Sequence, residues 1–124
     1  MSYVALVTDR FDEVTLFYGN LLGFPVVESW DRDNARGQRF DTGGMRLEII
    51  DNLREKHKLD LGGVANRVHI VIEVDDIEEA RTNIALTVDE VIDTSWGTRL
   101  FQVHDPDGIP ITYLQWLEKR EGRA

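Results

Sequence analysis

The sequence contains no cysteine, only three prolines and two methionines in 124 residues, and fewer basic than acidic side chains. Without cysteine there is no disulfide framework, thiolate zinc site, iron–sulfur cluster or cysteine nucleophile. No apolar run approaches the roughly 20 residues of a membrane span, and the N-terminus lacks a signal-type segment. We therefore expect a soluble, cytoplasmic protein of one domain, whose 42% apolar residues can form a core without cross-links.

The charge balance argues against nucleic acid as a partner. Lys and Arg number 14 against 23 Asp and Glu, which gives a net charge of −9, and the basic residues are scattered. Proteins that bind phosphate backbones usually carry a basic patch. The acidic excess favours solubility, and the alternative is that it attracts cationic ligands. We expect neither a nucleic-acid nor a membrane partner.

The sequence repeats itself at a distance of 66 residues. An apolar strand that ends in Asp occurs at residues 3–9 and again at 69–75. Asp9 and Asp75 are each placed to accept hydrogen bonds at a helix N-terminus, and Glu78 completes a capping-box spacing after Asp75. Apolar residues at helical spacing follow both aspartates. The repeat predicts a strand followed by a helix in each half.

Two further pairs of motifs continue this repeat. Ser29-Trp30 recurs as Ser95-Trp96, and a turn at 41–44 recurs at 105–108. The second turn reads Asp-Pro-Asp-Gly, with Pro and Gly at favourable turn positions. Each turn leads into an apolar strand. Each half therefore reads β-α-β-β-β.

These signals divide the single domain into four parts. We predict a first module over residues 1–50, a charged linker over 51–66, a second module over 67–117 and a C-terminal tail over 118–124.

The combination of motifs resembles the vicinal oxygen chelate superfamily, which contains glyoxalase I, bleomycin resistance proteins and extradiol dioxygenases. The resemblance implies an α+β fold in which two paired βαβββ modules form a cup-shaped mixed sheet around a small-molecule cavity. It also implies a homodimer. The matching segments are Val4–Val7 with Asp9, Phe17-Tyr18 with Leu22-Gly23-Phe24, Trp96-Gly97 with Phe101, and Asp105-Pro106-Asp107-Gly108.

The resemblance also marks four positions that hold a metal in members that use one. They lie at the start of the first strand and in the middle of the last strand of each module, and here they are Tyr3, Glu48, His69 and Thr112. Glu48 and His69 suit Zn, Ni, Fe or Mn, but a catalytic site usually needs three protein ligands. His57 in the linker and His104 before the turn are poorly placed to add one. We expect no cofactor, with one divalent metal as the alternative.

Strand alternation predicts which side chains share a face with these positions. Residues two apart on a strand point the same way, and in three of the four strands one face is fully apolar while the other is mixed. The mixed face, which we expect to meet the ligand, comprises Tyr3, Ala5, Val7, Arg46, Glu48, Ile50, His69, Val71, Glu73, Thr112 and Leu114.

We expect ligand contacts from Tyr3, Arg46, Glu48, His69, Phe101 and Thr112, with Trp30 or Trp96 at the rim. Simpler explanations compete at each position. His69 and Glu48 are able to satisfy each other without a metal, and Arg46 is able to pair with Glu73. The aromatic residues are able to serve only core or dimer packing.

Three functions fit this pattern. The first is a metal-free protein that binds an aromatic or cationic small molecule, with antibiotic sequestration implied by the resemblance. The second is a divalent-metal lyase, isomerase or dioxygenase that uses Glu48 and His69 as ligands. The third is an interaction module whose cavity is filled by its own aromatic side chains.

Overall fold

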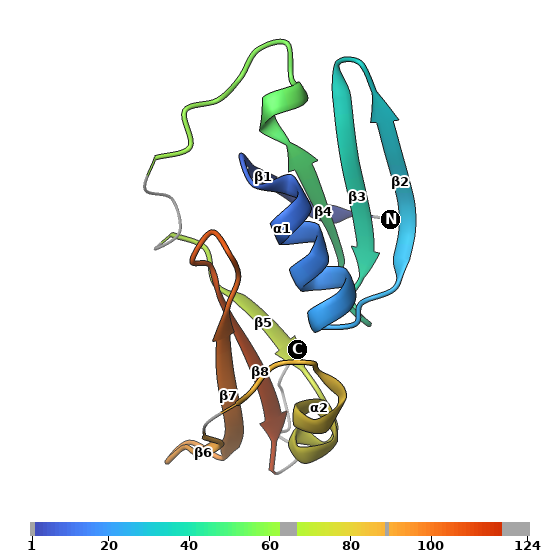
Figure 1. The fold of residues 1–124 in the computed structure, drawn as a ribbon. Coiled ribbons are helices and arrows are strands. Elements are labelled where there is room, and N and C mark those ends of the chain that lie inside the picture. Colours follow the sequence, from blue (N-terminus) through green and yellow to red (C-terminus); the bar gives the residue numbers. More distant parts are fainter. Residues whose placement is uncertain (1, 63–66, 89, 118–124) are drawn as a thin grey trace.

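The computed structural model describes residues 2–62, 67–88 and 90–117 and contains two modules of similar build (Figure 1). The expected order of one strand, one helix and three strands occurs in both modules, so the predicted α+β fold is confirmed. The first module comprises β1 (Tyr3–Thr8), α1 (Phe11–Leu16) with a π-helical continuation η1 (Phe17–Leu21), β2 (Val26–Arg32), β3 (Ala35–Asp41) and β4 (Arg46–Asp51). The second comprises β5 (Ile70–Glu73), α2 (Ile77–Asn83), β6 (Ile92–Asp93), β7 (Thr98–His104) and β8 (Pro110–Trp116).

Each module forms a four-stranded mixed sheet. The strand orders are β1-β4-β3-β2 and β5-β8-β7-β6. The first strand of each module pairs in parallel with the last, and the remaining pairs are antiparallel. As a result β1 and β5 are edge strands, each with one side free of a neighbouring strand within the described chain.

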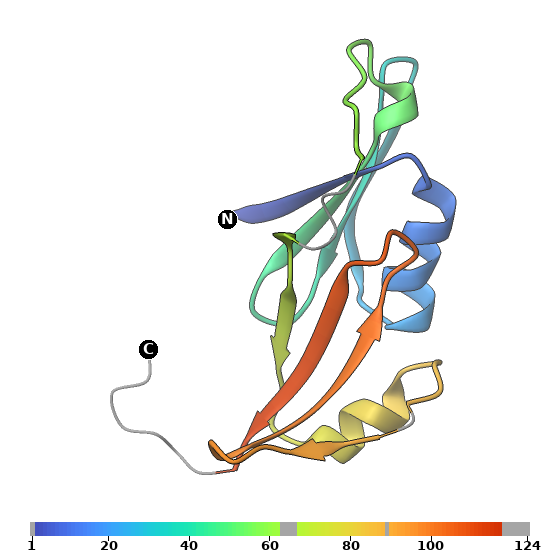
Figure 2. The same cartoon turned by 90° about the vertical axis from the view of Figure 1, so that its left-hand side faces the viewer.

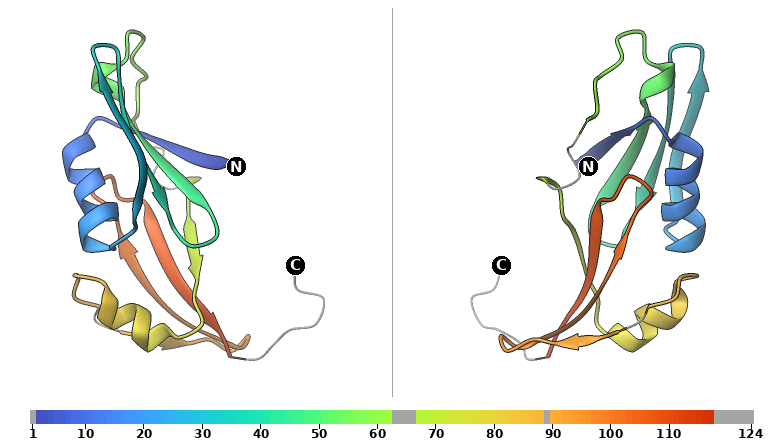
Figure 3. Two further views of the ribbon diagram at one scale, coloured as in Figure 1. Left: turned by 90° about the vertical axis from the view of Figure 1, so that its right-hand side faces the viewer. Right: turned by 60° about the vertical axis from the view of Figure 1, so that its left-hand side comes forward.

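The core lies between the sheets and the helices, which line one side of the molecule (Figures 2 and 3). Strand alternation sends one set of side chains toward the helices, and burial of that set supplies the main stabilisation. Leu47 and Ile49 of β4 and Ile111 of β8 are fully buried there. The buried residues of both modules belong to one connected cluster, so the two modules share a core.

A buried hydrogen bond joins the modules. The Tyr18 hydroxyl, at the end of the first helix, donates to Oδ2 of Asp105 at 2.7 Å. Asp105 opens the turn between β7 and β8, which reaches α1 in Figure 1, and its Oδ1 accepts from the backbone N–H groups of Asp107 and Ile109. Burial raises the pKa of the Asp105 carboxyl above its usual range, although these hydrogen bonds oppose the shift.

The structure corrects two expectations about helix starts. Asp76, one residue later than predicted, caps α2 by accepting from the N–H groups of Glu78 and Glu79. Asp9 does not cap α1, because its carboxylate accepts a hydrogen bond from the Asn52 side chain instead.

A short 3-10 helix, η2 (Asn52–Arg54), begins the connection between the modules. Residues 63–66 of the expected linker and the whole expected tail, 118–124, lie outside the described residues. No helix within the described ranges is long and apolar enough to cross a membrane.

Candidate functional site

The face of the first sheet that points away from α1 carries most of the predicted site residues of that module. We call it the first open face. Strand pairing sets Ala5, Glu48, Arg39 and Glu28 side by side across the four strands. The first open face includes Tyr3, Ala5, Glu28, Trp30, Gly37, Arg39, Arg46 and Glu48.

Arg39 holds Glu48 in a nearly buried ion pair. The Arg39 Nη2 and Nε atoms lie 2.6 and 3.1 Å from Glu48 Oε1, and Glu48 is only 5% exposed. The third nitrogen of Arg39, Nη1, donates to Glu28 at 2.8 Å, and these acidic partners raise the pKa of the guanidinium. The charge of Glu48 is therefore balanced within the protein.

Aromatic rings enclose the same guanidinium. The Arg39 carbon Cζ lies 4.2 Å from the Tyr3 ring centroid and 5.7 Å from that of Trp30, distances at which a cation and an aromatic face attract. The Trp30 ring lies against Gly37, where an added Cβ would come within 2.3 Å of Trp30 Cζ2. Glycine at this position lets the indole lie close to the sheet. Tyr3 remains 46% exposed.

Arg46 stands beside Tyr3 on the first open face. The two residues are register partners in the β1–β4 pair, and Asp41 lies opposite Arg46 on β3. Arg46 Nε is buried without a hydrogen-bond partner. The alternative of an Arg46–Glu73 ion pair does not hold, because Arg46 takes part in no ion pair among the described residues.

The corresponding face of the second sheet, the second open face, places His69 next to Thr112. His69 Nε2 lies 2.6 Å from the Thr112 hydroxyl oxygen, and Gln102 donates to the same oxygen at 3.2 Å. His69 precedes β5 and is exposed, while Thr112 is buried. The alternative of a direct Glu48–His69 pair does not occur, because each side chain has a partner within its own module.

Two tryptophans meet at the far end of the second open face. The rings of Trp96 and Trp116 make an edge-to-face contact with centroids 5.6 Å apart, and Trp116 Nε1 donates to Glu73 at 3.1 Å. Trp96 lies in the turn between β6 and β7 and is 49% exposed. This cluster supplies an accessible aromatic surface.

Phe101 does not belong to either open face. It is 1% exposed and stacks on Tyr113, with ring centroids 4.8 Å apart. Phe101 and Tyr113 are paired across β7 and β8, and both point into the core. The expectation that Phe101 contacts the ligand is therefore corrected, because strand alternation directs its side chain to the opposite face.

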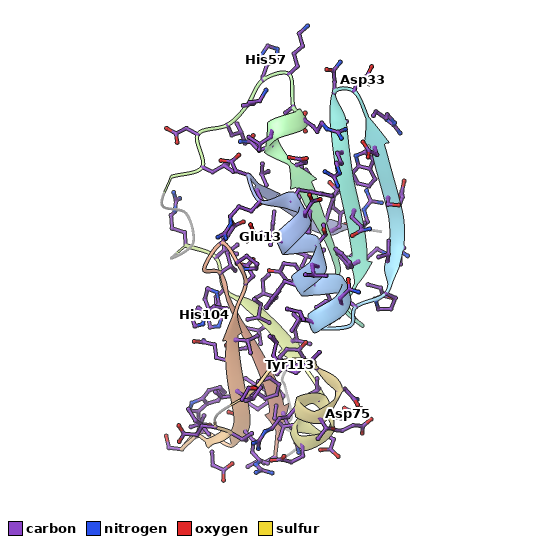
Figure 4. The ribbon with its side chains drawn as sticks, viewed as in Figure 1. Glu13, Asp33, His57, Asp75, His104 and Tyr113 are labelled. Atoms are coloured by element: carbon purple, nitrogen blue, oxygen red, sulfur yellow. The ribbon has the colours of Figure 1, made fainter. Side chains whose placement is uncertain are left out.

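The arrangement of donor groups does not fit a metal centre. Glu48 is covered by Arg39, and a cation there would have to displace the guanidinium. No group of three or more metal-binding side chains gathers in the described part of the chain. Figure 4 places His57 on the loop after η2 and His104 on β7 of the other module, so these histidines do not complete a set with Glu48.

Family comparison agrees with the architecture. Residues 1–113 match the family model of the Glyoxalase/Bleomycin resistance protein/Dioxygenase superfamily, and the chain belongs to that superfamily. Its members bind small molecules, often form dimers and often use a divalent metal. Comparison with curated protein sequences gives no match.

Three solved structures illustrate how broad the similarity is. A glyoxalase/bleomycin resistance protein/dioxygenase from Nocardioides is 21% identical with a TM-score of 0.69, covering 100% of this chain and 89% of its own. A lactoylglutathione lyase from Agrobacterium tumefaciens is 18% identical with a TM-score of 0.65, covering 93% and 92%. A fosfomycin resistance protein from Listeria monocytogenes is 14% identical with a TM-score of 0.64, covering 93% and 91%. At these identities the likeness concerns the fold.

Sequence reasoning missed Arg39, which proves central to the first open face. A usable signal existed in the turn at 41–44. The observed pair of Asp41 with Arg46, followed two residues further along both strands, sets Arg39 opposite Glu48 in the same hairpin register. An Arg placed opposite a predicted metal ligand indicates that the carboxylate has an internal partner.

Proposed function

We propose that this protein is a metal-independent binding protein for a flat aromatic small molecule, of the kind that sequesters antibiotics. The observation that carries the proposal is the ion pair between Arg39 and Glu48. If Glu48 bound a metal instead, the Arg39 guanidinium would lose this nearly buried partner and would lie beside a second cation, at a high cost. The family position that would hold a metal is instead part of the wall of a binding site.

Accessible aromatic surface supports binding rather than pure packing. Tyr3 and Trp96 are each about half exposed, at 46% and 49%, and the Trp30 ring lies against Gly37. Small-molecule sites combine such apolar walls with a few polar groups that fix orientation. Arg46, His69 and Thr112 provide these polar groups on the two faces.

A second copy of the chain is the partner we propose for the exposed edge strands. Tyr3, Val4 and Ala5 are exposed on both faces of β1, and Val71 of β5 is 49% exposed. Figures 2 and 3 show the start of β1 projecting away from the helices. Unpaired strand edges with apolar side chains favour association. Equilibrium sedimentation is expected to give twice the chain mass of 14.2 kDa.

The alternative of a divalent-metal lyase, isomerase or dioxygenase needs both Glu48 and His69 as ligands. Each has another partner, Arg39 in one case and Thr112 in the other. Among the described residues no contact supports this enzyme hypothesis, and metal-binding measurements distinguish it from the binding-protein hypothesis.

A thermal-shift screen tests the proposal. Chelator-treated protein is screened against aromatic compounds with and without added Zn, Ni, Mn and Fe(II). We expect aromatic ligands to raise the melting temperature equally in both conditions, because binding stabilises the native state by mass action. The Tyr3→Ala variant should lose part of the shift, because Tyr3 is the half-exposed ring of the first open face, while Leu53→Ala, at a 57% exposed position on η2, should keep it. Ligands that act only with metal would contradict the proposal.

A further inference from the structure

The first open face leaves one cation without a counter-charge. Arg46 is half-buried, its side chain makes no hydrogen bond or ion pair among the described residues, and its Nε is buried without a partner. Its carboxylate neighbour on β3, Asp41, accepts a hydrogen bond from the backbone N–H of Gly43 in the adjacent turn. A guanidinium stays protonated at every accessible pH. Arg46 therefore presents a permanent positive charge that the fold does not neutralise.

The other charges on this face are already balanced. Arg39 directs all three of its nitrogens at Glu48 and Glu28, so it has little capacity for a ligand. Glu48 is covered by Arg39 and is unsuited to attract a cationic ligand. Among the charged residues of the first open face, the charge available for recognising a ligand is therefore the positive charge of Arg46, although the whole chain carries a net charge of −9.

The position of Arg46 links this charge to an aromatic surface. Tyr3 is its register partner on β1, and the ring of Tyr3 stacks against Arg39 while remaining 46% exposed. A planar anion bound to Arg46 would lie beside this ring. Arginine recognises carboxylates through paired N–H donors, and a ring attached to the carboxylate is able to use the aromatic surface.

We propose that Arg46 is the anion-recognition residue of the site, and that the ligand is a flat aromatic molecule that carries a carboxylate. This inference rests on the proposed function and narrows it. The sequence suggests an aromatic or cationic ligand. The inferred ligand keeps the aromatic ring but carries a negative charge in place of a positive one.

A set of three probes that share one ring tests the inference. The probes are 2-naphthoate, 2-naphthamide and 2-naphthylmethylammonium, which differ in charge and little in shape. Titration of the isotope-labelled protein, followed by amide chemical shifts, gives dissociation constants and locates the contacts. We expect 2-naphthoate to bind tightest, with shifts centred on β1 and β4.

Variants of Arg46 separate the charge from its geometry. Arg46→Met should weaken 2-naphthoate by roughly 10- to 100-fold, because it removes charge-assisted hydrogen bonds, and should leave 2-naphthamide almost unchanged. Arg46→Lys should retain part of the affinity, since the charge remains without the planar fork. Arg81→Met removes the same charge from α2, where Arg81 faces Glu78, and should have no effect.

The outcomes separate the inference from the proposed function. If all three probes bind equally, or the cation binds best, the inference is wrong while the binding-protein proposal stands. If none binds, both fail. If Arg46→Met shifts the protein from dimer to monomer in sedimentation without changing relative probe affinities, Arg46 serves the contact between copies, and the inference is again overturned.

Discussion

Arg39 donates two hydrogen bonds to a single oxygen of Glu48, across adjacent strands of the first sheet. The resemblance to the superfamily leads us to expect a metal ligand at Glu48. A guanidinium that is part of the chain thus neutralises the carboxylate. This relationship supports the proposed function, because it gives Glu48 a partner other than a metal.

Replacing Arg39 with Met should destabilise the protein, because Glu48 would remain nearly buried without its counter-charge. Equilibrium urea unfolding of R39M, E48M and the double variant measures the effect. We expect the double variant to be more stable than R39M alone. Glu28→Gln, which affects only the 58% exposed partner of Arg39, is the control and should change stability by less than about 0.5 kcal/mol. Equal losses in E28Q and R39M would contradict this interpretation.

Two buried tyrosines should respond oppositely to loss of the hydroxyl. Tyr18 donates to Asp105, so Tyr18→Phe leaves a buried acceptor short of a partner and should cost about 1–3 kcal/mol. The Tyr113 hydroxyl is buried with no partner in the described structure, and burial raises the pKa of Tyr113 to about 12. Tyr113→Phe should therefore be neutral or stabilising. Urea unfolding of the two variants, compared at one pH, measures this contrast.

The stability of the protein should carry a pH signature of Asp105. Its pKa is raised in the folded state, chiefly by burial, so between the unfolded value of about 3.9 and the raised value the native state binds more protons. The contribution of this carboxyl to the free energy of unfolding is therefore full at low pH and declines as pH rises through the raised pKa. The Asp105→Asn variant has no ionisable group at this position, so this part of the pH dependence of stability is absent from it. The stability of the wild type relative to D105N should be higher at pH 4 than at pH 7, and a difference independent of pH would contradict the assignment.

The close contact between Gly37 and Trp30 should be sensitive to a single methyl group. Gly37→Ala would place Cβ within 2.3 Å of Trp30 Cζ2, so the indole must leave the sheet. We expect a loss of about 1–3 kcal/mol in stability and a red shift of tryptophan emission. Gly44→Ala, where an added Cβ meets nothing within 4 Å, is the matched control and should change neither property.

Much of the fold could be predicted from the sequence because it depends on local signals. The repeated strand ends, turns and apolar alternation indicated two βαβββ modules and the correct core face of β4, β5 and β8. Asp76 rather than Asp75 caps α2, because backbone geometry decides between adjacent candidates. Phe101 is one of several aromatic residues that the sequence offers for the wall of a ligand site, whereas its pairing with Tyr113 places it in the core.

The site was less predictable, because its contacts cross between strands. The partner of Glu48 depends on the register of the β3–β4 hairpin, which sets Arg39 beside it. The partner of His69, Thr112, depends on the register of the parallel β5–β8 pair. The unpaired state of Arg46 depends on what every neighbouring side chain does. The absence of a side-chain partner for Arg46 is therefore predictable only when all contacts of the first open face are known.

Metal titration decides whether Glu48 binds Arg39 or a metal in solution. Chelator-treated protein without a histidine tag is titrated with Zn, Ni, Fe(II) and Mn by calorimetry, alongside Glu48→Gln and His69→Ala. The account predicts no uptake of one metal per chain at micromolar concentrations, and the same baseline in both variants. Stoichiometric uptake by the wild type that disappears in both E48Q and H69A would show that Arg39 yields Glu48 to a metal, and would contradict the account.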